Sequence, residues 1–307
     1  MKSLTIFLLL VGGLIMLYAY SKQTTTNINE TKSILVASTP GGIVLKSMLG
    51  IPIKDSIDFI RWNLTIQEDR LFVLNLHYGL SQPNTLGFQK DGERLNLQGT
   101  YTITSSKKKT LNGVIYTLKS DAVPAPIRFI QVNNNVFHLL DDNDQLMIGN
   151  GGWSYTLNRK DVIADETSVL PALTPADAFL NDTALQRVYD GRTPCAAIAK
   201  TYHLPVGNDC FKLKWRLILH RDPKTLKPTT YTINRIKHSV EKTEAKWAIQ
   251  KGYGNNPDAV VIQLNPDKPD ESLSFLVGDE NVLFFLDNKK QLFTGNPDFS
   301  YTLNKVK

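Results

Sequence analysis

VFHLLDDNDQLMIGNGGWSYTLNR, residues 136–159, returns later in the chain as VLFFLDNKKQLFTGNPDFSYTLNK, residues 282–305. The two stretches align without a gap, and 12 of their 24 positions are identical. Shorter blocks repeat upstream in the same order: Thr39-Pro40 and Thr193-Pro194, Trp62 and Trp215, Thr100–Ile103 and Thr230–Ile233. Such collinear blocks indicate that one domain has been duplicated.

Both copies have the pattern of β-strands. In the first copy, apolar and polar residues alternate over short stretches at 64–66, 71–76, 95–97, 101–103, 114–118 and 127–132. The second copy has such stretches at 213–219, 231–233, 247–249, 260–264, 273–277 and 282–286. They are rich in Val, Ile, Thr, Tyr and Phe, and turn residues separate them. The sequence therefore predicts an all-β protein of two tandem small antiparallel meander β-barrels.

Helix signals are few. Thr39-Pro40 and Thr193-Pro194 have the residue types of a helix N-cap and first helical position, which predicts a short helix before each barrel, over 41–49 and 195–203. A third signature starts at Thr174. We therefore expect barrel copy one at 35–160, a linker with a short helix at 161–190, and barrel copy two at 191–307.

The N-terminus has the pattern of an export signal. Lys2 is followed by 17 uncharged residues from Leu4 to Tyr20, and a small-x-small site stands at 19–21. The run is longer than a usual signal core of about 7–15 residues and shorter than a membrane span of about 20. Residues 1–21 therefore predict a cleaved signal peptide or an uncleaved single membrane anchor. In either case, the rest of the chain is expected in the periplasm or cell envelope.

Composition excludes several classes of protein. The chain has 307 residues, a net charge of +6 and 42% hydrophobic residues, which is typical of a globular protein. Its basic residues are scattered and follow no nucleic-acid-binding motif. Neither H-E-x-x-H nor G-x-S-x-G occurs, so we expect no enzyme activity and no cofactor. The acidic stretch 141–144 is interpreted as a β-turn, because its counterpart at 287–290 contains two lysines that would repel a cation.

The two cysteines are the strongest candidate site. Cys195 and Cys210 align with Gly41 and Ile57, so the first copy lacks both. If the two cysteines are bonded to each other, a copy without the bond should lack both of them. A disulfide that closes a loop of about 15 residues stabilises a fold by about 3 kcal/mol. The alternative is a soft-metal site for Cu(I) formed by Cys195, His203 and Cys210. An oxidising compartment favours the disulfide.

These residues resemble the N-terminal domain of NlpE-like envelope proteins. The resemblance rests on Arg192-Thr193-Pro194-Cys195, on Asp209-Cys210 before a Lys-Trp-x-Leu-x-Leu strand, and on the repeated Ser-Tyr-Thr-Leu-Asn at 154–158 and 300–304. It implies a lipocalin-like barrel and roles in envelope stress signalling, adhesion sensing or copper tolerance. The family has a Cys-x-x-Cys pair and a lipid-bearing cysteine. Here the cysteines are 15 positions apart, the lipid-bearing cysteine is missing, and only Cys195 and Cys210 have counterparts.

The first functional interpretation is a non-catalytic exported envelope protein that works as a binding or sensing module of two NlpE-like barrels. Its partner would be another envelope protein or a small apolar ligand, with no role for nucleic acid. Membrane contact would come only through an uncleaved N-terminal segment. If bulky side chains fill the barrels, recognition moves to their outside. The alternative function is metal (copper) handling through Cys195 and Cys210.

Overall fold

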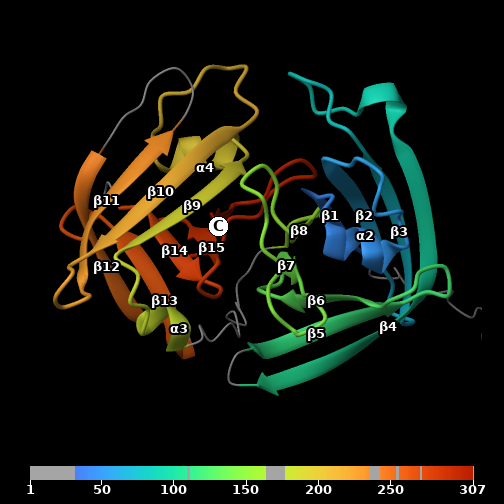
Figure 1. Cartoon of the computed structure of the whole chain (residues 1–307), viewed down its shortest axis with the longest axis horizontal. Coiled ribbons are helices and arrows are strands. Elements are labelled where there is room, and N and C mark those ends of the chain that lie inside the picture. Colours follow the sequence, from blue (N-terminus) through green and yellow to red (C-terminus); the bar gives the residue numbers. More distant parts are fainter. Residues whose placement is uncertain are drawn as a thin grey trace, which may run out of the picture. The chain divides into compact units, whose positions relative to one another are not determined.

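The computed structural model describes residues 32–108, 111–163, 177–235, 243–253, 256–269 and 272–306. It contains two closed antiparallel barrels in tandem, each of eight strands (Figure 1). The predicted all-β fold and the presence of two similar barrels are therefore confirmed. The predicted signal or anchor at 1–21 lies outside the described residues. Among the residues that are described, no helix is long and apolar enough to cross a membrane.

Barrel one is a meander whose strands pair in chain order, and its last strand pairs with its first. Its strands are β1 (Ser33–Pro40), β2 (Phe59–Ile66), β3 (Leu71–Gly79), β4 (Glu93–Lys108), β5 (Leu111–Lys119), β6 (Ile127–Gln131), β7 (Val136–Leu139) and β8 (Thr156–Arg159). It also contains α2 (Ile43–Leu49) and the short 3₁₀ helix η1 (Gln89–Asp91). The stretches expected as two strands at 95–97 and 101–103 are parts of the single long strand β4.

Barrel two repeats this order. Its strands are β9 (Gln186–Thr193), β10 (Leu213–Arg221), β11 (Pro228–Arg235), β12 (Thr243–Tyr253), β13 (Asn256–Leu264), β14 (Ser274–Val277), β15 (Val282–Leu286) and β16 (Thr302–Lys305). Its helix α4 (Ala196–Thr201) occupies the place of α2, and α3 (Asp177–Leu180) comes before β9. Because β9 closes barrel two against β16, residues 186–190 belong to the barrel and not to the expected linker.

The sequence predicts a short helix before each barrel, but in the structure α2 and α4 follow the first strand of their barrel. Thr39 and Thr193 are not helix caps, because they lie in β1 and β9 and each hydroxyl accepts the buried indole N–H of a tryptophan. Both bonds, from Trp62 and from Trp215, are 2.9 Å long. A buried indole N–H without an acceptor would be costly, so these threonines are fixed by the core.

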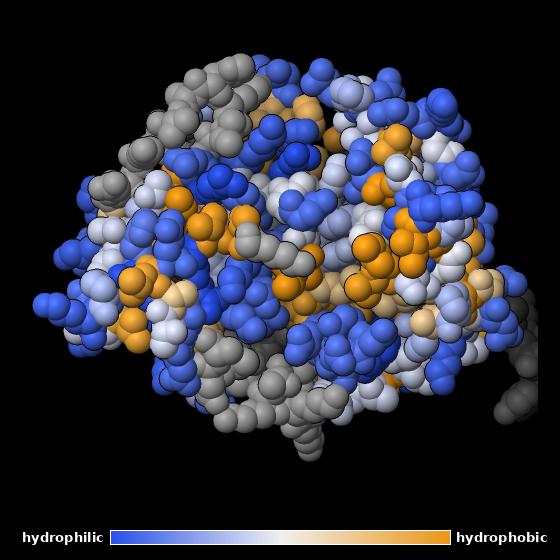
Figure 2. Space-filling view, in the orientation of Figure 1, coloured by the Kyte–Doolittle hydropathy of each residue, from blue (hydrophilic) through white to orange (hydrophobic). Residues whose placement is uncertain are grey.

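Each barrel has its own apolar interior. Along β10, residues from Leu213 to Arg221 alternate between buried and exposed or half-exposed positions, with Lys214 and Arg216 on the outside. Large buried side chains fill the centre of each barrel. They include Trp62, Phe72 and Phe129 in barrel one and Trp215, Phe275 and Phe285 in barrel two. Figure 2 shows mainly hydrophilic residues on one face of the molecule, with hydrophobic residues in separate groups.

A third apolar cluster, which we call the seam, joins the two barrels. It combines buried residues of both copies, and they occupy equivalent positions in the repeat: Ile115, Ile130, Val136 and Leu140 from barrel one, and Val261, Leu276, Val282 and Leu286 from barrel two. Each barrel thus contributes the same patch of its outer surface. This is the arrangement of a two-fold symmetric dimer, here formed within one chain.

The repeated Ser-Tyr-Thr-Leu-Asn motif supplies the polar contacts of the seam. The two motif asparagines reach across in opposite directions, since Asn158 accepts the backbone N–H of Gly295 at 2.7 Å and Asn304 accepts that of Gly149 at 2.8 Å. A Cβ atom on either glycine would lie 2.9 Å from the asparagine of the other barrel. The longest identity between the copies is therefore explained by the contact between them.

The motif threonines meet between the barrels. The hydroxyls of Thr156 and Thr302 lie 2.9 Å apart and are buried. Next to them, His138 of barrel one faces its equivalent, Phe284 of barrel two, edge to face with ring centres 5.6 Å apart. His138 also hydrogen-bonds to the Thr156 hydroxyl through Nδ1. Equivalent residues in mutual contact mark the position of the approximate two-fold axis.

Candidate binding site between the barrels

The predicted disulfide is present. Cys195 and Cys210 are bonded, with their Cα atoms 5.9 Å apart, and they join the start of α4 to the segment before β10. In barrel one, Gly41 and Ile57 occupy the corresponding places, and the Ile57 side chain fills the space next to Gly41. Barrel one therefore replaces the covalent link with a close apolar contact.

The alternative metal site is not assembled in this form of the protein. Both sulfurs are held in the disulfide, so neither is a thiolate that could bind Cu(I). Across the part of the chain that the structure describes, no group of three or more His, Cys, Asp or Glu side chains is placed to hold a metal ion. The copper alternative with Cys195, His203 and Cys210 would thus apply only to a reduced protein.

The acidic stretch at 141–144 forms a turn. One oxygen of Asp141 accepts the backbone N–H groups of Asn143 and Gln145, both at 2.9 Å. Asp287 does the same with Lys289 and Gln291, both at 2.8 Å. These bonds are typical of a turn stabilised by an aspartate side chain. The interpretation as a turn is therefore confirmed in both copies.

A cleft of about 100 Å³ lies where the two barrels meet, and we call it the junction cleft. Barrel one contributes one wall, and the end of β9, the residue before β10 and the loop before β16 contribute the other. The residues that line it are Ser38, Phe59, Arg61, Ser81–Leu86, Trp153, Arg192, Lys212, Asp298 and Phe299. None of these residues is among the site residues predicted from the sequence.

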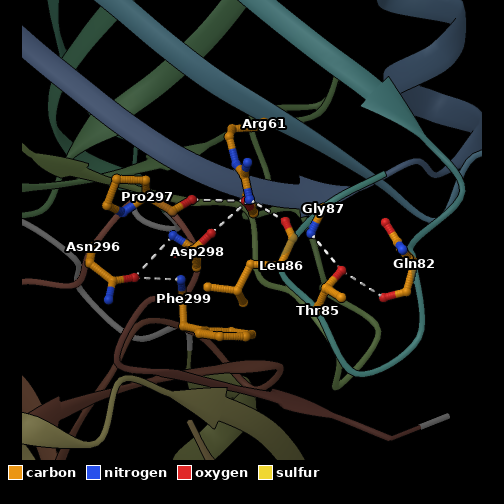
Figure 3. A network of polar contacts seen from close by, with 10 residues as sticks. Arg61, Gln82, Thr85, Leu86, Gly87, Asn296, Pro297, Asp298 and Phe299 are labelled. Carbon is orange, nitrogen blue, oxygen red and sulfur yellow. Dashed lines mark hydrogen bonds and ion pairs between the residues drawn. The ribbon is translucent and has the colours of Figure 1, made fainter. Parts of the chain in front are cut away.

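Arg61 of barrel one links the two walls of the junction cleft by hydrogen bonds (Figure 3). Its guanidinium donates to the carboxylate of Asp298 and to the backbone carbonyl of Leu86, both at 2.7 Å. Ser38 adds a bond of 2.8 Å to the carbonyl of Pro297. The side chains of Arg61 and Asp298 are 31% and 23% exposed, so this pair is partly shielded from water. Asp298 is thus already neutralised inside the cleft.

Aromatic rings form the apolar surface of the cleft. Phe59 stacks between Phe88 and Trp153, with ring centres 4.2 and 4.8 Å away. Phe299 comes from the other barrel, and its N–H is fixed by Asn296 at 2.9 Å. Both faces of Phe59 are therefore covered by other rings, and these aromatic side chains form an apolar wall of the cleft.

Two cations lie against these rings. The guanidinium carbon of Arg192 lies 5.5 Å from the ring centre of Trp153, and Nζ of Lys212 lies 5.8 Å from that of Phe299. Burial lowers the pKa of Arg192, and burial together with the nearby charges of Arg192 and Lys214 lowers the pKa of Lys212. Among the described residues neither has a carboxylate partner. The cleft therefore has an excess of positive charge.

The two cations without a carboxylate partner among the described residues both come from barrel two. Arg192 precedes Thr193 and corresponds to Ser38, which precedes Thr39. Lys212 comes directly before Leu213, the residue that pairs with Thr193 in the barrel. Phe59 comes directly before Ile60, which pairs with Thr39, so Lys212 corresponds to Phe59. A comparison of the two copies position by position would have shown this difference, but only the structure shows that these positions meet.

A larger cleft of about 510 Å³ lies beside the first and includes Tyr155, Asp58, Asp190 and Asn304. Its carboxylates already have partners, since Asp58 accepts from Ser81 and Asp190 accepts from Arg216. The amide nitrogen of Asn304 has no partner, but the same holds for Asn158 at the equivalent place in the seam. This cleft therefore offers less unsatisfied charge than the junction cleft.

Comparison of the chain with family models, curated proteins and solved structures found no match, so the resemblance to NlpE-like proteins stays a prediction.

Proposed function

We propose that this protein is a non-catalytic, exported binding or sensing module of the cell envelope, and that it recognises its ligand or partner at the outside of its barrels, in the junction cleft. The observation that carries this proposal is the filled interior of both barrels. An eight-stranded barrel is just wide enough for side chains or for one small ligand, and here side chains occupy the space.

Two further features support the proposal. The disulfide between Cys195 and Cys210 suits an oxidising compartment outside the cytoplasm. The junction cleft combines aromatic faces with two cations that have no carboxylate partner among the described residues. Unsatisfied charge in a partly dry cleft is typical of a site that binds something else.

Export is tested by the mass of the protein after expression of the full chain in a Gram-negative host. We expect it in the periplasmic or membrane fraction, with no thiol that reacts with an alkylating reagent until a reductant is added. The mass would show removal of the N-terminal segment if a signal peptidase cuts it. A cytoplasmic protein with two reactive thiols would contradict the proposal.

The place of recognition is tested by tryptophan fluorescence during a screen of small metabolites. The chain has four tryptophans: Trp153 lines both the junction cleft and the larger cleft beside it, while Trp62, Trp215 and Trp247 are buried in the barrels. Binding in the cleft should change the emission of the wild-type protein but not that of Trp153→Phe. A response that survives this substitution would place the ligand away from the junction cleft and contradict the proposal.

A further inference from the structure

The ion pair between Arg61 and Asp298 has an equivalent place across the two-fold axis, and there the carboxylate is replaced by glycine. In the aligned repeat, Gly152 corresponds to Asp298, and Lys214 corresponds to Arg61. The pair crosses from barrel one to barrel two over 2.7 Å. Its equivalent would cross from Lys214 to residue 152, where glycine offers no side chain. Barrel two thus supplies a carboxylate to barrel one and receives none in return.

The structure places a cation next to Gly152. A Cβ atom at this position would lie 3.6 Å from Nη1 of Arg192. Arg192 in β9 pairs directly with Lys214 in β10, so their side chains share one face of the barrel. Like charges directly opposite each other on a sheet are destabilising. A carboxylate beside Gly152 would therefore reach two cations that repel each other.

Lys212 adds a third positive charge to this face, because it stands two residues before Lys214 and alternate residues of an extended chain share a face. Burial, and then the nearby charges of Arg192 and Lys214, lower the pKa of Lys212. Arg192 and Lys212 are half-buried, whereas Lys214 is exposed. We call these three residues the basic cluster.

The carboxylates of this region are already engaged. Asp190 on β9 accepts two bonds from Arg216, at 2.8 and 2.6 Å, and Asp298 is held by Arg61. Over the described ranges of the chain, no ion pair involves a member of the basic cluster. The cluster therefore has a net charge that an acidic group from outside the chain can neutralise.

The size of the junction cleft limits what can enter it. Its volume of about 100 Å³ corresponds to roughly three waters at about 30 Å³ each. A carboxylate, with one carbon and two oxygens, is a group of this size, so the rest of its molecule must stay outside. Arg192 and Lys212 line the cleft, and Lys214 continues the cluster outside it. Three cations are more than one carboxylate neutralises, which favours a chain with several acids over a single small acid.

We propose that the basic cluster docks an acidic segment of a partner protein, and that one carboxylate of this segment binds beside Gly152 as Asp298 binds Arg61. Arg192 supplies a planar pair of donors to that carboxylate, while Lys212 and Lys214 supply point charges to its neighbours. Acids at alternate positions of an extended segment share a face and match the spacing of the two lysines. This inference rests on the proposed function, because it names the kind of partner that the junction cleft takes.

The test is calorimetric titration of the full, disulfide-bonded chain with a blocked hexapeptide in which aspartate and serine alternate. We expect a one-to-one complex. The same peptide with asparagine in place of aspartate should bind at least about tenfold more weakly, and so should acetate at an equal concentration of carboxylate. Raising NaCl from about 0.05 M to about 0.5 M should weaken binding, because the cations are not fully buried.

Variants locate the site. Gly152→Asp supplies the carboxylate from within the chain and should weaken peptide binding by about tenfold or more. Gly152→Asn is the matched control, since it adds a side chain of the same shape without the charge, and it should keep the wild-type affinity. The φ angle of Gly152 lies outside the left-handed region, so its backbone accepts both.

Two further variants complete the set. Arg192→Ser introduces the barrel-one residue and should also weaken binding by about tenfold or more. Lys251→Gln removes an exposed lysine on β12 outside the cluster and should leave affinity unchanged. Thermal unfolding checks that each variant folds.

Several results would overturn the inference. They are no binding of the acidic peptide at millimolar concentration, equal binding of the asparagine peptide, and equal affinity in folded Gly152→Asp and Gly152→Asn proteins. Acetate that binds as tightly as the peptide would assign the cluster to a free small acid instead. A wild type that dimerises in sedimentation, with a monomeric Gly152→Asp, would assign it to a second copy of this chain.

The proposed function is tested separately. A peptide that fails to bind leaves the fractionation and alkylation results unchanged, and a metabolite that changes the emission of Trp153 would then keep the proposed function without this inference. Conversely, a cytoplasmic, reduced protein that binds the acidic peptide beside Gly152 would overturn the proposed function and leave the partner class standing.

Discussion

The two barrels have the same strand order and both contribute to the seam, but they use different side chains to make equivalent hydrogen bonds. At the turn before β7, Asn133 accepts the N–H groups of residues 135 and 136 through its side-chain oxygen. At the equivalent turn before β15, Asp279 accepts those of residues 281 and 282. The same hydrogen bonds are made by a neutral amide in one copy and by an acid in the other. The turn therefore requires the acceptor oxygen and not the charge.

The largest expected effect comes from making barrel two like barrel one at this turn. Burial raises the pKa of Asp279 to about 7, from its ordinary value of 3.8. A raised pKa in the folded state means that stability is fully present below about pH 4 and is lost as the pH rises through 7. Asp279→Asn should thus raise the free energy of unfolding by about 4 kcal/mol above pH 8, and by little below pH 3.

Urea unfolding of the wild type and Asp279→Asn from pH 3 to pH 9 measures this gain. The reverse exchange, Asn133→Asp, is the matched control and should destabilise barrel one in the same pH range. A gain that does not depend on pH would show that the aspartate is not desolvated as described.

The next effect concerns the disulfide, which only barrel two possesses. Cys195→Ala with Cys210→Ala removes it, and we expect a loss of about 3 kcal/mol in the free energy of unfolding, because the loop of 15 residues is no longer closed. Guanidinium unfolding of the variant, with and without reductant, measures it. Reductant should lower the stability of the wild type to that of the variant. A wild type insensitive to reductant would refute the expectation.

His138 gives an effect of similar size and opposite dependence on pH. Its Nε2 donates to the Met147 carbonyl at 2.9 Å, and burial lowers its pKa from 6.5 to about 4. The unfolded chain takes up a proton near pH 6.5 and the folded protein only near pH 4, so stability falls as the pH falls across this window. The loss reaches about 3 kcal/mol at pH 4.

Replacing His138 by the residue of barrel two, His138→Phe, should remove this loss. The variant loses two hydrogen bonds at neutral pH, so the quantity to compare is the slope of stability between pH 6.5 and pH 4. His138→Phe should make that slope less positive, whereas Asp279→Asn should make it more positive. Two variants with the wild-type slope would contradict both pKa assignments.

The smallest effect tests the symmetry of the seam. The hydroxyl of Thr302 hydrogen-bonds to that of Thr156. The Thr156 hydroxyl also hydrogen-bonds to His138 and Ser154. Thr302→Val should therefore cost about 1 kcal/mol, the net value of one buried hydrogen bond, and Thr156→Val should cost more. Thermal unfolding at pH 7 compares them. Equal costs would mean that the network of His138 contributes nothing beyond the threonine pair.

Much of the fold could be predicted because the copies repeat. The alternating stretches from 213 to 219 and from 260 to 264 lie in β10 and β13, and the paired loss of both cysteines correctly indicated a disulfide. The first strand of each barrel was missed. Thr39-Pro40 and Thr193-Pro194 have the residue types of a helix start. In the structure each threonine instead lies in a strand, where its hydroxyl accepts a hydrogen bond from a buried tryptophan indole N–H.

The junction cleft could not be predicted in the same way. Seam residues such as Ile130 and Leu276 have the residue types of any core strand, and nothing in their order shows that they face another barrel. The cleft exists only because the seam brings Arg192 and Trp153 together from positions far apart in the chain. A site that depends on the contact between two repeats leaves its trace only in the differences between them.

The seam has a consequence for any attempt to work with half of the molecule. A single barrel would carry its patch of apolar side chains into water, and that patch is complementary to itself. An isolated barrel one should therefore pair with a second barrel one at sufficient concentration. Within the intact chain the tether replaces this encounter, since linked partners meet at an effective concentration of about millimolar. Covalent linkage thus allows the two halves to diverge, because neither has to recognise its own copy any longer.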